Sequence, residues 1–312
     1  MILKLKWLMA TFAFTLLSAC GGGDDPPGNL AEVAQANGFT ALTAAATKAG
    51  LVPTLTNASA NLTVFAPTNA AFDALAGRLG FANATAMVNA LPGPALADIL
   101  SYHVLPARRS AAELAAGGST QATAYVFAGA PATLAVGTTG GVSLTDAVLT
   151  NARVTGADVP ASNGVIHVVD KVLVPPGVLN IVQMAQANPA FSALVDAVVA
   201  ADLQGTLSGA GPFTVFAPTN DAFDSIASTV AGLSTGQLTT VLTYHTLGSQ
   251  VLAANVPIGT PVTTLSGQTF TVQANPLRIT DTTATAADVL ATDVRASNGV
   301  IHVIGKVLIP AL

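Results

Sequence analysis

The sequence predicts an α+β protein made of two tandem, homologous domains. The chain has 312 residues, a length typical of about two domains of roughly 150 residues each. Its second half repeats landmarks of the first half in the same order. Within each half, segments with helical spacing of apolar residues alternate with short runs rich in β-branched residues. That alternation indicates helices packed against a strand-rich body.

The internal repeat is the strongest signal. Residues 63–69 read TVFAPTN and recur identically 151 positions later. The pair Tyr102-His103 returns 142 positions later, and the segment ASNGVIHV at 161–168 returns 135 positions later. The shrinking offsets imply that the second domain lost nine residues and then seven, losses that we expect in surface loops.

These landmarks set the predicted domain bounds. We expect domain one at residues 30–175 and domain two at residues 178–312. Pro175-Pro176-Gly177 lies between them, and its prolines predict a short, fairly stiff joint.

Each domain should begin with a helix. Asn29 and Asn180 precede apolar residues spaced i, i+3, i+4, and Asn is a favoured N-cap residue. Two later segments with helical spacing, at 95–101 and 237–243, lead into the Tyr-His pairs.

A strand and a capped helix follow the first helical region. The β-branched and aromatic run at 62–66 predicts a strand that Pro67 ends. Thr68 or Asn69 should then cap a helix that turns Phe72 inward. The same pattern recurs in domain two, with Thr219 or Asn220 as the cap.

The rest of each domain should consist of strands. Runs rich in Thr, Val and Gly predict strands at 132–136, 142–144 and 269–272. Two closing pairs of strands are expected, at 165–169 with 171–174 and at 300–304 with 306–309. Asn163-Gly164 and Asn298-Gly299 are tight-turn dipeptides that should set the preceding strand against each pair.

At these landmarks the sequence resembles the fasciclin domain family. TVFAPTNAAF and TVFAPTNDAF are similar to that family's first signature, and SNGVIHVVDKVLVP and SNGVIHVIGKVLIP to its second, with the Tyr-His pair between them. The resemblance covers nearly all of residues 30–312. It implies a wedge-shaped β-sandwich with packed helices in each domain. It also implies secreted or surface-anchored modules of adhesion and extracellular-matrix proteins.

The N-terminus has the pattern of an export signal. Lys4 and Lys6 precede an apolar stretch at 7–17, which is too short to span a membrane but suits a secretory signal. The following LSAC ends at Cys20, the single cysteine of the chain, and resembles the lipobox of bacterial lipoproteins. We therefore expect a signal peptide at 1–19 and a lipidated Cys20. The alternative is an incidental cysteine near an ordinary cleavage site.

The segment after the cleavage site bears on localisation. Residues 20–29 should form the lipidated residue and a flexible spacer, because they carry Gly, Pro and Asp without periodicity. Gly21 after the cysteine implies outer-membrane delivery by resemblance to the enterobacterial sorting rule. The exposed face, surface or periplasmic, stays open.

Composition excludes several classes of protein. The chain is 51% hydrophobic and 9% charged, which excludes an intrinsically disordered chain. A net charge of -5 and a pI of about 5.1 argue against nucleic-acid binding. Mean hydropathy is +0.60, yet no apolar run after Cys20 approaches the roughly 18–20 residues of a spanning helix.

The histidines are the first residues to consider for chemistry. All four lie on the landmarks. A zinc site needs three or four ligands, and no compact cluster supplies them, so we expect no metal and no cofactor. His167 should be a hydrogen-bonded core residue of its strand. In animal relatives the Tyr-His region is implicated in integrin recognition. That resemblance makes four residues candidates for partner contact, with a structural role as the favoured alternative: Tyr102, His103, Tyr244 and His245.

The other landmark residues are expected to be structural. They are Thr68, Asn69, Asn163, Gly164 and His167 in domain one, and Thr219, Asn220, Asn298, Gly299 and His302 in domain two. The sequence has no HExxH or GxxxxGK[ST] motif, and nothing orders a Ser, His and Asp into a triad. We therefore expect no enzymatic activity.

Two functions remain. The first is a membrane-anchored adhesion or matrix-interaction protein with an unidentified protein or matrix partner. Its low surface charge would reduce the desolvation cost of contact. The second is a periplasmic carrier lipoprotein that holds a small apolar ligand, or a protein partner, in a cleft between the domains.

Overall fold

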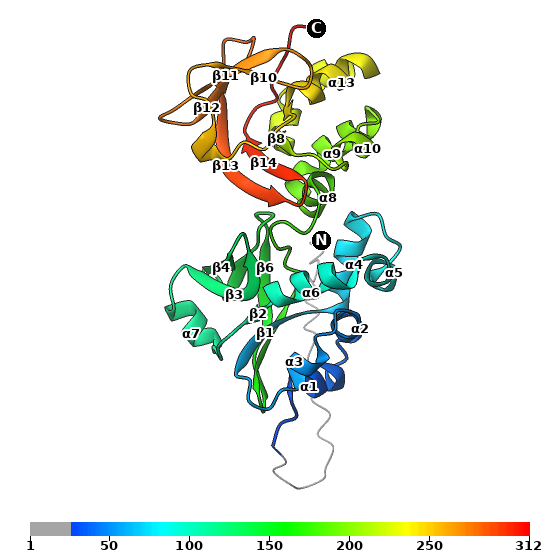
Figure 1. Cartoon of the computed structure of the whole chain (residues 1–312), viewed down its shortest axis with the longest axis vertical. Helices are drawn as coiled ribbons and strands as arrows, with labels where there is room; N and C mark the ends of the chain where they lie inside the picture. Colours follow the sequence, from blue (N-terminus) through cyan, green and yellow to red (C-terminus); the bar gives the residue numbers. More distant parts are fainter. Residues whose placement is uncertain (1–25) are drawn as a thin grey trace, which may run out of the picture.

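The computed structural model describes residues 26–312. Two domains follow one another along the long axis of the molecule, with domain two above domain one in Figure 1. In each domain the strands gather on one side and most helices on the other. The predicted signal peptide, Cys20 and most of the predicted spacer lie outside the described residues.

Domain one contains seven helices and seven strands within the described residues. The helices are α1 Leu30–Ala36, α2 Thr40–Lys48, α3 Val52–Thr56, α4 Asn69–Arg78, α5 Ala84–Ala90, α6 Gly93–Tyr102 and α7 Ala111–Ala116. The strands are β1 Leu62–Pro67, β2 Val104–Leu105, β3 Thr120–Phe127, β4 Ala130–Gly137, β5 Ser143–Thr145, β6 Asn151–Ala161 and β7 Gly164–Val169.

Domain two repeats this plan with shorter outer strands. Its α-helices are α8 Ile181–Ala187, α9 Ser192–Ala200, α10 Gln204–Leu207, α11 Asn220–Asp224, α12 Ala227–Ala231 and α13 Thr235–Tyr244, with 3-10 turns η1 at Pro189–Phe191 and η2 at Ala253–Asn255. Its strands are β8 Phe213–Pro218, β9 Thr246–Leu247, β10 Pro261–Thr263, β11 Thr269–Gln273, β12 Arg278–Thr280, β13 Ala287–Ala296 and β14 Gly299–Ile304.

The two sheets have the same topology. Their strand orders are β2-β1-β7-β6-β5-β4-β3 and, read from the equivalent edge, β9-β8-β14-β13-β12-β11-β10. The long strands β6 and β13 each carry two register shifts against their neighbours. Such bulges bend a strand and increase its twist, so each sheet curls over an interior core. The predicted α+β fold is confirmed, with one curled sheet per domain forming the sandwich.

In each domain, the two segments that resemble the fasciclin signatures lie side by side. Strand β1 pairs in parallel with β7, with Phe65 opposite His167, and β8 pairs in the same way with β14, with Phe216 opposite His302. A parallel pair needs a crossover connection. Here the connection consists of all the elements between the two paired strands. Each sheet therefore brings together residues about 100 positions apart.

Local sequence explains the helix starts. Asn29 accepts hydrogen bonds from the backbone N–H groups of Ala31 and Glu32, and the Glu32 carboxylate accepts one from the Asn29 backbone. This is a capping box, which satisfies donors that a helix start would otherwise leave unpaired. Asn180 forms the same arrangement with Gln183.

Residues 171–174 and 306–309 were predicted as strands, and that prediction is wrong. Their N–H groups pair with side chains instead of a neighbouring strand. The Leu173 N–H donates to Nε2 of His103 at 2.8 Å, and the Val174 N–H donates to the Asp146 carboxylate at 3.0 Å. Leu308 and Ile309 repeat these bonds in domain two.

Two further expectations need correction. The tight turn before β7 consists of Ser162 and Asn163, because Gly164 already pairs with Ala161 in the ladder. The nine residues that domain two lacks do not come from a simple loop. Domain one has α5 between α4 and α6, whereas only residues 232–234 join α12 to α13. The loss removed a helix, whose buried Met87 and neighbours have no counterpart.

The apolar core has three parts. One cluster lies between the helices and the sheets and contains residues of both domains. Two smaller clusters lie inside the curled sheets, around Phe65 and Tyr102 in domain one and around Phe216 and Tyr244 in domain two. The shared cluster means that the domains are packed against each other.

Hydrogen bonds and one aromatic contact hold the joint. The Gly177 N–H donates to the Arg295 carbonyl at 2.9 Å, and the Arg78 guanidinium donates to the Ala187 carbonyl at 2.9 Å. The Arg295 guanidinium lies 5.5 Å from the centre of the Phe127 ring. Gly177 has a φ of +78°, and a Cβ there would lie 2.2 Å from the same ring. The joint is therefore a fixed contact between the domains.

Candidate functional site

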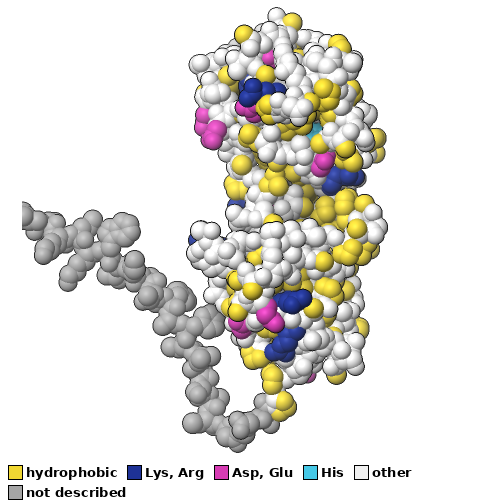
Figure 2. Space-filling model, turned by 90° about the vertical axis from the view of Figure 1, so that its left-hand side faces the viewer, with side chains coloured by type: hydrophobic (Ala, Val, Ile, Leu, Met, Phe, Trp, Pro, Cys, Tyr) yellow, Lys and Arg dark blue, Asp and Glu magenta, His cyan; other side chains and the backbone are white. Residues whose placement is uncertain are grey.

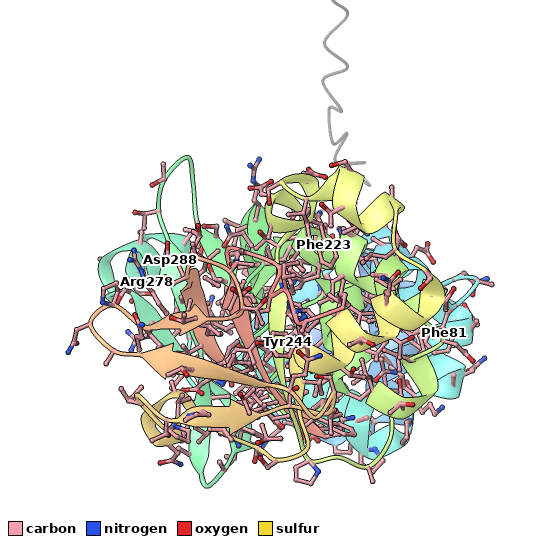
Figure 3. All side chains as sticks on the ribbon, turned by 90° about the horizontal axis from the view of Figure 1, so that it is seen from above. Phe81, Phe223, Tyr244, Arg278 and Asp288 are labelled. Carbon is pink, nitrogen blue, oxygen red and sulfur yellow. The ribbon has the colours of Figure 1, made fainter. Side chains whose placement is uncertain are left out.

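The tyrosines of the Tyr-His pairs are interior residues. Tyr102 ends α6 with 1% of its surface exposed, and its hydroxyl donates to the Thr133 carbonyl at 2.9 Å. Tyr244 ends α13 fully buried, and its hydroxyl donates to the Thr269 carbonyl at 2.9 Å. Figure 3 shows Tyr244 between the helices and strands of domain two. Burial raises the pKa of both, that of Tyr244 to about 12, so both stay protonated.

The adjacent histidines lock the closing segment to the helix. His103 donates from Nδ1 to the Ile99 carbonyl at 2.7 Å and accepts at Nε2 from the Leu173 N–H. His245 makes the same two bonds, to Val241 and from Leu308. Both ring nitrogens are used, which fixes a neutral tautomer with the proton on Nδ1.

Burial keeps these histidines uncharged. Desolvation lowers the pKa of His103 and of His245 from 6.5 to about 4, because the charged ring loses its hydration. Each side chain is 1% exposed. In the folded state, neither Tyr-His pair presents a surface to a partner, and the geometry favours the structural alternative for all four candidates.

The histidines of the central strands are also fully engaged. His167 accepts at Nδ1 from the Asp158 N–H at 3.2 Å and donates from Nε2 to the Arg109 carbonyl at 2.8 Å. Its ring stacks on Phe65 with centroids 5.8 Å apart. His302 repeats this arrangement with Asp293, Val251 and Phe216. Burial lowers the pKa of His302.

Asn163 connects three segments that are distant in the sequence. Its Oδ1 accepts from the Leu30 N–H at the start of α1, and its Nδ2 donates to the carbonyls of Leu55 and Asn57 at 2.9 and 3.0 Å. Asn298 makes the equivalent three bonds in domain two, to Ile181, Leu207 and Gly209.

The glycine after each asparagine is required by close backbone approach. A Cβ at Gly164 would lie 2.3 Å from the Leu62 carbonyl oxygen, and one at Gly299 would lie 2.1 Å from that of Phe213. These are the points where the two parallel central strands start together.

The Thr-Asn pairs divide two structural tasks. Thr68 is the N-cap of α4 and accepts from the Ala71 N–H at 3.1 Å. Asn69 instead ties α4 to the start of α2, accepting from the Ala41 N–H and donating to the Gly38 carbonyl. Thr219 and Asn220 do the same in domain two.

A buried ion pair in each domain was missed at the sequence level. Lys171 pairs with Asp146, and Lys306 pairs with Asp281 at 2.7 Å. Both aspartate side chains are fully buried, and each also accepts from the backbone of the closing segment. The two pairs share the 135-residue offset of the repeat, which was the signal that could have found them.

This arrangement positions backbone and does not assemble reactive groups. Within residues 26–312 no group of three or more His, Cys, Asp or Glu side chains could hold a metal ion. The described histidines direct both ring nitrogens to the chain itself. The signature residues thus form a hydrogen-bonded frame around the central strands.

The alternative function, a carrier, would need an apolar cleft between the domains. A hollow of about 220 Å³ beside the joint is lined by the charged side chains of Arg78, Asp170 and Lys171, by apolar residues of domain one and by Ala187 of domain two. An apolar cavity of about 190 Å³ lies instead within domain one, between α1, α2, α3 and the sheet.

No helix in the described part of the chain combines the length and hydrophobicity that crossing a bilayer would need.

Comparison with known proteins gives consistent results. The model of the fasciclin domain matches residues 37–175 and 189–310. Protein sll1483 of Synechocystis is 45% identical over 139 residues, which cover 43% of this chain and 75% of that protein. Transforming growth factor-beta-induced protein ig-h3 of Sus scrofa is 35% identical over 163 residues, or 51% of this chain and only 23% of that longer protein.

A solved structure is also similar. A FAS1 domain pair from the insect cell adhesion molecule fasciclin I aligns over 90% of this chain with 17% identity and a TM-score of 0.42. The family model covers most of the chain, in two copies that coincide with the two sheets and their helices. The chain therefore belongs to the fasciclin domain family.

Proposed function

We propose that this protein is an exported, non-enzymatic adhesion or matrix-interaction protein, anchored in the bacterial cell envelope by lipid on Cys20. Fasciclin domains are found in adhesion and extracellular-matrix proteins. The observation that carries the proposal is the pairing of two complete fasciclin domains through a fixed joint, with the signature polar groups used internally. Such a body suits presentation of a surface better than turnover of a substrate.

Partner contact is proposed for the exposed faces, since the Tyr-His pairs are buried. On the face shown in Figure 2, charged side chains are few and lie far apart, and hydrophobic side chains gather near the level where the two domains meet. Only 9% of the residues are charged. Contact through such a face strips few hydrated ions, which lowers the desolvation cost of binding. The partner is a protein or matrix surface.

The lipid anchor is part of the same proposal. Each buried methylene of an acyl chain contributes about 0.8 kcal/mol, so several chains hold a protein firmly at a membrane. Replacing Cys20 in the full chain should release the protein into the soluble fraction. A membrane-bound Cys20→Ala protein would contradict the anchor.

Protease treatment of intact cells tests the exposed location. If the domains face the medium, external protease should remove them from unbroken cells, as followed by immunoblotting. A periplasmic protein must survive as a loading control. Protection of both domains until the outer membrane is permeabilised would exclude direct attachment and favour the periplasmic carrier.

Adhesion itself needs a separate measurement. Cells that lack the protein should attach less to a surface or matrix than cells with the full chain restored. Cells that secrete the Cys20→Ala chain should resemble the deletion. Equal attachment by all three strains would contradict the adhesive role.

A further inference from the structure

We propose that the apolar cavity of domain one is a binding site for a small neutral molecule, or the end of one, that is mostly hydrocarbon. The cavity of about 190 Å³ is lined mainly by aliphatic side chains of α1, α2 and α3, and its floor is formed by Val64, Leu100 and Ile166. This site is independent of the exposed surfaces to which adhesion is assigned.

The cavity has an opening to solvent. Gln35 of α1, Thr47 of α2 and Val52 of α3 line it and are exposed. Val52 is one of the few large hydrophobic residues with more than a third of its surface exposed, at 37%. A ligand can therefore enter between three short helices without opening the sheet, and its polar end would meet an amide and a hydroxyl.

Domain two shows that the fold does not require this space. The equivalent site lies between α8, α9, α10 and strand β8, and there the cavity is only about 30 Å³. The equivalence of lining residues follows from shared bonds. In domain one the side chains of Asn69 and Asn163 form hydrogen bonds with the backbone of Ala41 and Leu55. In domain two Asn220 and Asn298 form the same bonds with Ala193 and Leu207, so Ala41 is equivalent to Ala193 and Leu55 to Leu207.

Two positions account for much of the difference. Ala31 and Ala46 of domain one correspond to Val182 and Val198 of domain two. Each valine carries two more carbon atoms than alanine, and packed interiors normally leave few voids larger than a water molecule. The second domain thus demonstrates a filled version of the same site on the same scaffold.

The chemistry of the lining selects a neutral ligand. Within the described residues, the cavity is lined by no Lys, Arg, Asp or Glu side chain. Its one titratable group, His103, uses both ring nitrogens within the chain. An anionic head would have no counter-ion in the lining, and burying an unpaired charge is costly.

Volume sets the size of the ligand. An apolar cavity of about 150 Å³ accepts benzene. A volume of about 190 Å³ therefore suits one aromatic ring with a small substituent, or a short aliphatic chain. Larger molecules would insert one end and leave the rest at the opening beside Gln35 and Thr47.

Binding of fluorobenzene to the full chain, followed by 19F NMR, tests the proposal. We expect saturable binding of one equivalent, and binding of 4-fluorobenzoate weaker by at least about tenfold because of its charge. Absence of saturable fluorobenzene binding would overturn the proposal. Equal binding of the benzoate would overturn the neutral selectivity.

Matched variants assign the binding to the cavity. Ala31→Val with Ala46→Val copies the filled state of domain two and should weaken fluorobenzene binding at least about tenfold. The reciprocal pair, Val182→Ala with Val198→Ala, should create a second saturable site. Fluorobenzene also dissolves in any lipid that copurifies with the protein. The filled variant, purified in the same way, measures this background. Unchanged binding by a folded filled variant would place the ligand elsewhere and overturn the proposal.

Folding of the variants is checked by circular dichroism. If the filled double variant does not fold, Ala46→Val alone replaces it. Ala44→Val, at an exposed position of α2 outside the cavity lining, is the control that should bind normally. The adhesive function is tested separately by attachment of cells that carry the filled variant. These cells should still attach, because the variant keeps the outer surface of the protein.

Discussion

The two domains share one hydrogen-bonded frame but fill it differently. In both, the asparagine before the last central strand holds the first helix, and the Tyr-His pair locks the closing segment. The buried ion pair recurs at the same place. The two domains differ in the packing of their apolar side chains and in the elements at the edges of the fold. Domain two lacks α5, has shorter outer strands, and has a cavity of about 30 Å³ where domain one has about 190 Å³.

The comparison separates two kinds of constraint. A buried polar group must keep its partner, because an unpaired one costs about 1–3 kcal/mol. Apolar contacts are non-directional, so side chains can change size while the fold persists. The polar frame is therefore repeated almost bond for bond, whereas the packing around it has diverged.

The largest expected effect is loss of the asparagine bonds. Asn298→Ala leaves the Ile181 N–H and the carbonyls of Leu207 and Gly209 without their partner. We expect a loss of about 4 kcal/mol in the free energy of unfolding, seen by hydrogen exchange first in domain two. Asn163→Ala should do the same in domain one.

Ser162, the exposed neighbour of Asn163, provides the control, since Ser162→Ala should change the free energy of unfolding little. If Asn298→Ala lowered protection equally in both domains, they would unfold as one unit, and the comparison between them would fail at the level of stability.

Packing around the cavity should respond asymmetrically. Val198 is 6% exposed, and Val198→Ala should cost about 2 kcal/mol because it leaves new empty space. Ala46→Val fills existing space and should cost less than about 1 kcal/mol. Urea unfolding measures both. Equal and large losses would mean that the domain-one cavity cannot accept the added methyl groups.

Acid should destabilise both domains through the same histidine. The pKa of His103 and of His245 is about 4 in the folded state, against 6.5 ordinarily. Between these values the unfolded chain binds the proton and the folded chain does not. Stability is therefore complete above about pH 6.5 and falls as the pH drops toward 4, by up to about 1.4 kcal/mol per pH unit for each histidine.

Urea unfolding at pH 7, 6 and 5 checks this dependence. His103→Gln and His245→Gln should each remove one histidine's contribution to the slope of the free energy of unfolding against pH. Each should also lower stability at pH 7. A slope that both variants leave intact would assign the acid sensitivity to other groups.

The joint should contribute a smaller effect. Arg78→Ala with Arg295→Ala removes one hydrogen bond and one cation–π contact between the domains, together worth on the order of 1–2 kcal/mol. We expect a broader distribution of maximum dimensions in small-angle X-ray scattering, with both domains still folded. An unchanged distribution would show that the shared apolar cluster and the remaining hydrogen bonds, such as that from the Gly177 N–H to the Arg295 carbonyl, are enough to fix the joint.

The smallest effect is expected at the surface of domain two. Arg278 and Asp288 form an ion pair at 2.5 Å, but their side chains are 46% and 56% exposed. Figure 3 shows them together at the outer edge of the domain. Arg278→Ala should lower stability by less than about 1 kcal/mol, an effect that salt abolishes. A loss comparable to that of Asn298→Ala would contradict this ranking.

Sequence patterns determined the elements whose signals are local. The repeat, the caps Asn29 and Thr68, and the strands that contain TVFAP and GVIHV all follow from neighbouring residues, because capping and strand preference act within a few positions. The fold class and the family followed from the order of these landmarks, and both are confirmed.

Only the tertiary structure decided which distant groups meet. Residues 171–174 resemble a strand by composition, but their N–H groups bond to His103 and Asp146, which no local pattern reveals. The Tyr-His pair was a candidate contact and lies in the core because strands from elsewhere cover it. The cavity of domain one is what remains after all side chains are packed. Burial and empty volume depend on every neighbour at once, and therefore on the complete fold.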